Sequence, residues 1–154
     1  MTHSETLNAQ VLRPGDWVER SVTFDCDSIR AYAAMVGDWS PWHHDEAVAA
    51  RSRFGGLIAS GSQTSGIMLG VLTQFILQRH TSLGLEFSFQ LKKAVRANMP
   101  FTIFWEVATI EPKPSLGGDI ALFKGKLTNA QMEIAILAEN KSVLFPKKHL
   151  LCGS

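Results

Sequence analysis

Asp38 and His43 are the two side chains of this sequence whose types and spacing could support acid/base chemistry. They lie five residues apart in a segment that contains Pro41, and a loop of this kind can fold back so that both side chains point to one place. A carboxylate and an imidazole that meet can hold one water molecule and move its protons. The sequence therefore predicts an acid/base site at this loop.

A glycine-rich segment, residues 54–61, follows this loop and leads into a long apolar stretch. Glycine lets the backbone approach a bound molecule closely, and amides at the N-terminal end of a helix stabilise developing negative charge. We expect the amides of Gly56 and Gly61 to lie near such a charge, although both glycines could equally serve only as turn residues. Ser62 and Ser65 follow at the start of the apolar stretch, where hydroxyls most often cap a helix or lie on its face.

The elements that position these residues are a strand and three helices. A turn at Pro14 leads into the strand. An aspartate precedes each of the first two helices and can accept a hydrogen bond from the first helical turn. Gly37 is suited to end the first helix. Apolar residues at intervals of three and four mark the longest helix. We expect a strand over 17–24, a helix from Asp25 or Asp27 to Gly37, and helices over 46–53 and about 62–79.

The second half of the sequence changes from helical to strand periodicity. Alternating or β-branched and aromatic runs cover residues 85–89, 101–110, 119–128 and 132–145, and turn-forming residues separate the last three runs. Helices followed by consecutive antiparallel strands predict an α+β fold in which one antiparallel sheet wraps the long central helix. We expect one domain over residues 1–154, of which residues 1–10 form a flexible leader.

Composition excludes several classes of protein. The 154 residues include 45% hydrophobic residues, enough for an ordinary core, and 15 basic against 14 acidic residues give no footprint for nucleic acid. The apolar run over 67–77 is too short to span a membrane. Cys26 and Cys152 lack metal-ligand spacing and indicate reduced thiols, so we expect a soluble, cytoplasmic protein.

Two segments together resemble a known family, the MaoC-like or R-specific enoyl-CoA hydratase branch of the hotdog-fold superfamily. The first reads Gly37-Asp38-x-x-Pro41-x-His43-x-Asp45, and the second is Phe54-Gly55-Gly56-Leu57-Ile58-Ala59-Ser60-Gly61. The strand at residues 87–95 is also similar to that family. The sequence differs from many relatives in having Ser40 in place of asparagine and Ser60 in place of histidine. The serine that assists in the hydratases would fall near Gly66, and the resemblance leaves Ser62 and Ser65 as nearby substitutes for it.

The resemblance implies both a reaction and partners. In the family, the residues matching Asp38 and His43 orient a water that adds to a trans-2-enoyl-CoA and gives a (3R)-3-hydroxyacyl-CoA, or they catalyse the reverse dehydration. The substrate is then an acyl-CoA thioester, with coenzyme A as part of the substrate and no metal or other cofactor. The resemblance also implies a homodimer or higher homo-oligomer.

Two other functions remain open from the sequence. One is a hotdog acyl-CoA thioesterase, and the other is a non-catalytic module that binds acyl thioesters. Among neighbouring residues, Asp45 is expected to cap a helix, and His44 to face solvent or a loop carbonyl. Basic residues in the tail at 147–148, or at Lys92, Lys93 and Arg96, could contact the phosphates of coenzyme A.

Overall fold

A computed structural model describes residues 11–147 of the chain. The leader expected for residues 1–10 and the thiol of Cys152 lie outside the described residues, while Cys26 is a free cysteine. The elements follow one another as β1 (Trp17–Thr23), α1 (Cys26–Met35), the 3₁₀ helix η2 (Pro41–His43), α2 (Glu46–Arg51), α3 (Gly61–Leu77), β2 (His80–Leu91), β3 (Pro100–Lys113), the 3₁₀ helix η3 (Pro114–Leu116), β4 (Gly118–Asn129) and β5 (Ile134–Pro146).

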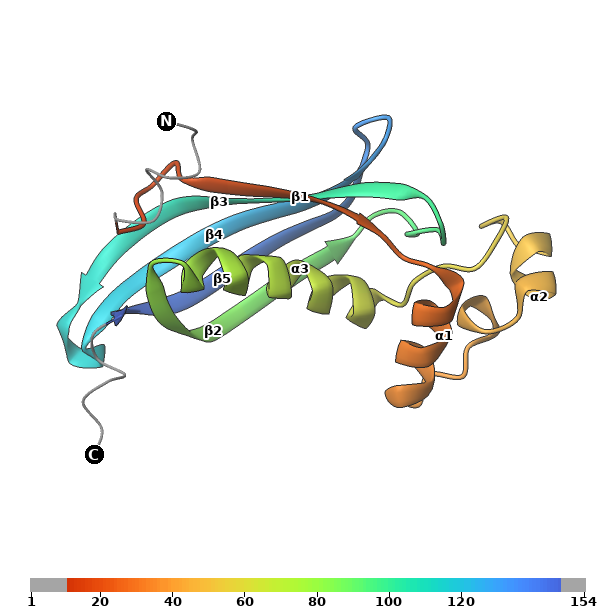
Figure 1. The fold of residues 1–154 in the computed structure, drawn as a ribbon, viewed down its shortest axis with the longest axis horizontal. Helices are drawn as coiled ribbons and strands as arrows, with labels where there is room; N and C mark the ends of the chain where they lie inside the picture. The colour runs from red at the N-terminus through yellow and green to blue at the C-terminus, as the bar shows by residue number, and fades with distance from the viewer. Residues whose placement is uncertain (1–10, 148–154) are drawn as a thin grey trace.

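The strands form one antiparallel sheet that curves around α3. Their order across the sheet is β1-β3-β4-β5-β2, so β1 and β2 are the two edges. Figure 1 shows α3 lying across the concave face of the sheet, while α1 and α2 lie together beyond one end of it. The α+β arrangement expected from the sequence, a sheet around one long helix, is confirmed. Between residues 11 and 147, no helix is long and apolar enough to cross a membrane.

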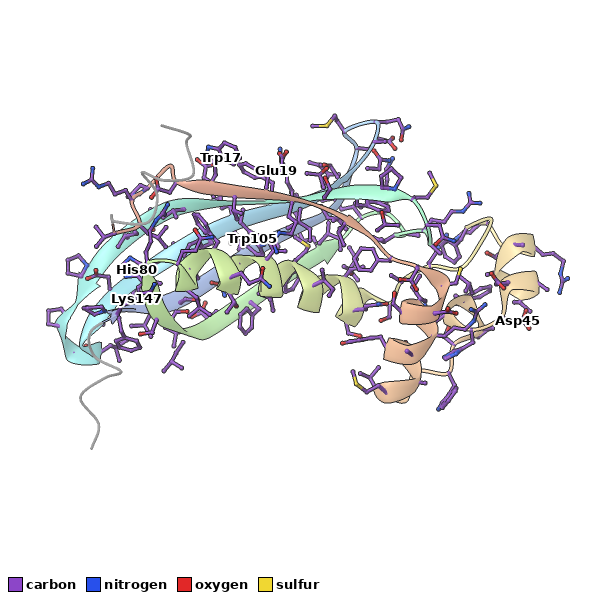
Figure 2. All side chains as sticks on the ribbon, viewed as in Figure 1. Trp17, Glu19, Asp45, His80, Trp105 and Lys147 are labelled. Atoms are coloured by element: carbon purple, nitrogen blue, oxygen red, sulfur yellow. The ribbon has the colours of Figure 1, made fainter. Side chains whose placement is uncertain are left out.

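Trp105 fastens α3 to the middle of the sheet (Figure 2). Its side chain is fully buried, and its Nε1–H donates a hydrogen bond to the carbonyl of Met68 on α3 at 2.8 Å. The indole ring covers Gly125 on the neighbouring strand β4, where an added Cβ would lie 2.5 Å from the ring. Glycine is therefore required at this position, because it lets the ring lie close to the sheet and satisfy its N–H inside the core.

Side-chain caps set where the helices begin. Asp25, Asp45 and Ser60 each accept a hydrogen bond from a backbone N–H in the first turn of α1, α2 and α3. The capping role expected for Asp45 is thus confirmed. Gly37, with φ of 76°, follows the end of α1 and turns the chain toward the loop that carries Asp38.

Two expected boundaries are corrected by the structure. Strand β2 begins at His80, five residues before the expected start at Leu85, so α3 ends at Leu77 rather than near Arg79. Met132 is not the first residue of a strand: it lies in the β4–β5 turn with φ of 62°. The side chain of Asn129 accepts hydrogen bonds from two amides of this turn, and such local bonding of asparagine overrides the strand preference of its neighbours.

His80 is a buried histidine at the junction of α3 and β2. Its ring is 7% exposed, and its Nε2 accepts a hydrogen bond from the backbone N–H of Leu12 at 3.0 Å. Burial lowers the pKa of His80 below its ordinary value of 6.5, against the smaller opposing effects of a hydrogen bond with the Phe145 backbone and the charge of Asp119. The folded chain therefore favours the neutral ring.

Replacing His80 with glutamine should make stability less dependent on pH. Between the lowered pKa and 6.5 the unfolded wild-type chain binds a proton that the folded chain does not, so its free energy of unfolding falls as pH drops below 6.5. His80→Gln keeps an acceptor for the Leu12 amide but cannot titrate. Urea unfolding from pH 7.5 to pH 5 should show a shallower loss for the variant, and parallel curves would contradict this role.

Candidate active site

The backbone after α1 places Asp38 at the head of the η2 loop. Its amide donates to the carbonyl of Ala33 at 2.8 Å, which continues the hydrogen bonding of the helix end. One carboxylate oxygen, Oδ1, accepts the amide of Ser40 at 3.1 Å and closes a small turn within the loop. The other oxygen, Oδ2, is therefore available to face His43.

His43 is held on the opposite side of the loop by a backbone carbonyl. The side chain is buried, and its Nδ1 lies 2.7 Å from the carbonyl oxygen of Ile58. A carbonyl can only accept a hydrogen bond, so Nδ1 carries the proton. The Nε2 atom of the neutral ring is then left as a hydrogen-bond acceptor and a base.

Asp38 and His43 face one another across a short gap. Asp38 Oδ2 lies 3.4 Å from His43 Nε2, and the aspartate side chain is 40% exposed while the histidine side chain is 10% exposed. With His43 neutral, both facing atoms are acceptors, so neither satisfies the other. A water molecule at this place can donate one O–H to each, which makes the pair suited to orient and deprotonate it.

A cavity of about 290 Å³ opens beside the imidazole of His43. Its body is mostly apolar, and Gly61 and Thr64 of α3 line it together with Leu91 at the end of β2. Asp38 is not part of the lining, and its carboxylate is connected to the cavity only through its 3.4 Å approach to the lining residue His43. A mostly apolar cavity with a few polar groups in its lining is the usual form of a site for a small organic group.

The structure brings together only some of the residues singled out by sequence. Gly61 lines the cavity, and an added Cβ there would lie 2.5 Å from Leu91 Cδ1, so glycine lets the Leu91 side chain pack closely against the start of α3. Gly56 lies outside the lining, against the guanidinium of Arg96. Ser62 and Ser65 also lie outside it, and the hydroxyl of Ser62 is 3.3 Å from that of Ser60.

Two features of the site were missed by sequence reasoning. The Ile58 carbonyl that orients His43 is a backbone group, and no residue type signals its position. Thr64 is buried and lines the cavity, while its hydroxyl donates to the carbonyl of Gly61 at 3.0 Å. Thr64 lies three residues after Gly61 and so shares its helix face. This spacing is the sequence signal that could have identified Thr64 as a residue of the site.

A second histidine, His44, stabilises the η2 loop through a hydrogen bond to its backbone. Its Nε2–H donates to the carbonyl of Asp38 at 2.8 Å, which confirms that His44 meets a loop carbonyl, and its ring stacks on Trp39 with centroids 5.0 Å apart. The carbonyl of His44 accepts a hydrogen bond from Arg30 Nε at 3.2 Å, and Arg30 also pairs with Glu46 at 2.9 Å. These contacts tie the η2 loop to α1 and α2.

Removing the His44 donor should loosen the loop without removing the aromatic stack. His44→Phe keeps a ring against Trp39 but leaves the carbonyl of Asp38 without its partner, which costs about 1 kcal/mol of unfolding free energy for a lost hydrogen bond of this kind. Urea denaturation monitored by circular dichroism measures the difference. A variant as stable as wild type would show that this bond contributes nothing to the loop.

Comparison with known proteins places the chain among hydratases and dehydratases. No curated protein sequence gives a significant match. An (R)-hydratase from A. caviae involved in PHA biosynthesis superposes with a TM-score of 0.78 at 25% identity, over 88% of this chain and 99% of the hydratase. A MaoC-like dehydratase from Rhodospirillum rubrum gives a TM-score of 0.73 at 25% identity, over 88% and 94% of the two chains.

A more distant structure, the ChsH1-ChsH2 complex from Mycobacterium tuberculosis, has the same fold, with a TM-score of 0.74 at 16% identity over 87% of this chain and 99% of the other. The expected hotdog fold is confirmed by these superpositions. The model of the MaoC like domain matches residues 10–109, which is more than half of the sequence and includes the loop of Asp38 and His43. The chain therefore belongs to the MaoC-like dehydratase family.

Proposed function

We propose that this protein adds water to a trans-2-enoyl-CoA to give a (3R)-3-hydroxyacyl-CoA, or catalyses the reverse dehydration. The observation that carries the proposal is the pair of acceptors, Asp38 Oδ2 and His43 Nε2, 3.4 Å apart, of which His43 lines a mostly apolar cavity. Family membership and the fold shared with the A. caviae (R)-hydratase support the same reaction.

The reaction needs only a proton shuttle around one water. Asp38 accepts one O–H of the water and His43 Nε2 takes the other proton while the water oxygen bonds to C3. The π electrons of the C2=C3 bond move toward the thioester, whose carbonyl oxygen becomes an enolate oxygen. The imidazolium of His43 then returns the proton to C2, the carbonyl re-forms, and one water has been added.

The enolate oxygen needs hydrogen-bond donors, and the start of α3 offers them. Amides of the first turn of a helix have no partner within the helix, and Gly61 both begins α3 and lines the cavity. We assign its amide as a donor to the thioester oxygen, with support from the positive end of the helix dipole. No metal or redox cofactor enters this scheme, because it moves only a water molecule and a proton.

Substitution of either acceptor should remove the activity. Asp38→Asn and His43→Gln each keep a side chain of similar size but lose the carboxylate or the base, so turnover should fall by about two or more orders of magnitude. The measurement is the loss of enoyl-thioester absorbance with crotonyl-CoA and longer enoyl-CoAs. Asp45→Asn and His80→Gln are matched controls outside the site, and both should retain the wild-type rate.

Other outcomes of this assay would identify a different function. Wild-type turnover in either Asp38→Asn or His43→Gln would reject the assigned role. Release of free coenzyme A thiol from acyl-CoA would indicate a thioesterase, and enoyl-CoA that binds but stays unchanged would indicate a binding module.

We propose further that the chain forms a homodimer through strand β2. This strand is an edge of the sheet and pairs only with β5 among the described strands. Leu83, Leu85 and Phe87 on it are 62%, 46% and 55% exposed. An apolar edge strand that is exposed tends to pair with another chain, so such strands are normally covered in the native assembly. A second copy presenting the same strand would continue the sheet across a two-fold axis.

A charge on this edge should separate the dimer. Leu83→Glu places a carboxylate on a side chain that is mostly exposed in one chain, so folding is preserved while a dimer would have to bury the charge. Light scattering coupled to size-exclusion chromatography should report twice the chain mass for wild type and a single chain for the variant. Met132→Glu, in the β4–β5 turn, should remain dimeric; a monomeric wild type would reject the proposal.

A further inference from the structure

We infer that Arg53 and Lys92 bind the phosphate groups of the substrate's carrier at the mouth of the catalytic cavity, and that the carrier is coenzyme A rather than a carrier protein. The inference rests on the proposed function, because it concerns the end of the same thioester that lies outside the cavity. It assigns substrate selection to residues that take no part in the proton transfer.

The charged side chains that line the cavity beside His43 are all positive. Three cations, Arg53, Lys92 and Lys93, line it, and no carboxylate does. The charge of Lys93 is already paired with a carboxylate, because its Nζ lies 2.5 Å from Glu133 Oε1. This hydrogen bond lowers the pKa of the Glu133 carboxyl. Arg53 and Lys92 form no ion pair with a carboxylate anywhere in residues 11–147, so their charges are open to a ligand.

A further cation, Arg96, is outside the lining but directly follows the lining residue Val95 in the chain. Its guanidinium packs on the backbone of Gly55 and Gly56, 3.5 Å and 3.1 Å from the places where Cβ atoms would stand, and it too has no ion pair within the described part of the chain. The whole sequence carries a net charge of only +1. The positive charge at this mouth is therefore a local concentration and not a property of the entire surface.

The two lysines are positioned through their backbone and Arg53 through its side chain. The amides of Lys92 and Lys93 both donate to the carbonyl of Ala135, at 2.8 Å and 3.1 Å, which fixes the end of β2 against β5. The guanidinium of Arg53 lies over the ring of Phe54, 5.0 Å from its centroid. Both Arg53 and Lys92 are exposed, so their charged ends can meet a group in solvent.

The chemistry of the two possible carriers decides between them. A thioester whose acyl group reaches His43 extends its pantetheine arm out of the mouth, and phosphate lies at the far end of this arm. Coenzyme A has a diphosphate and a ribose phosphate there, whereas a carrier protein has one phosphodiester. Arginine binds phosphate through paired N–H groups and lysine as a point charge, so several cations around one mouth match the more highly charged carrier.

The test compares two thioesters with the same pantetheine arm, of which only crotonyl-CoA carries the phosphorylated adenosine part. Crotonyl-CoA and crotonyl-pantetheine present the same reacting group, and rates are measured for wild type, Arg53→Gln, Lys92→Gln and the double variant. Each single substitution should raise KM for crotonyl-CoA by about tenfold, the loss of roughly one charge-assisted contact to phosphate. The kcat for both substrates and the KM for crotonyl-pantetheine should stay at wild-type values.

Lys124→Gln, an exposed lysine of β4 outside this cavity, is the control and should match wild type with both substrates. Equal KM changes for both thioesters, no change for either, or faster wild-type turnover of crotonyl carrier protein than of crotonyl-CoA would overturn the inference. Calorimetric binding of coenzyme A and of pantetheine separates the phosphate site from the proposed reaction. If wild type turned over neither thioester, the proposed reaction would fail. Weaker coenzyme A binding by Arg53→Gln than by wild type would still support the phosphate site.

Discussion

The hydrogen bond between His43 Nδ1 and the Ile58 carbonyl is the constraint on which the site depends. It fixes which ring nitrogen carries the proton, and it leaves Nε2 as an acceptor opposite the Asp38 carboxylate. Two acceptors facing each other at 3.4 Å create a place that only a donor such as water satisfies. The chemistry thus follows from one backbone carbonyl whose position is set by the approach to α3.

That carbonyl is placed by long-range packing rather than by its own segment. Ile58 forms an isolated antiparallel bridge with Arg96, and the flanking bonds from Ala59 to Val95 and from Ala97 to Leu57 measure 2.8 Å each. The approach to α3 is therefore joined to the segment between β2 and β3, while Trp105 fastens the helix itself to the sheet. The same segment presents Lys92 at the mouth of the cavity, so one junction positions both the base and the cationic rim.

Much of this architecture could be predicted from the sequence, because the signals are local. Capping residues and the change from helical to alternating periodicity indicated the helices and the succession of strands along the chain, and the spacing of Asp38 and His43 indicated that they meet. The tautomer of His43 and the role of Thr64 depend on residues brought together by folding. Met132 was misassigned because side-chain hydrogen bonds of Asn129 shape that turn, and hydrophobic patterns do not register such bonds.

The protonation site of His43 is the most direct test of this account. Long-range proton–nitrogen correlation spectra of the ¹⁵N-labelled protein, with the His43 ring assigned by its loss in His43→Gln, distinguish the two neutral tautomers. The structure predicts a proton on Nδ1 and a free Nε2 for the neutral ring. A neutral His43 protonated on Nε2 would contradict the bond to Ile58 and leave no base facing Asp38.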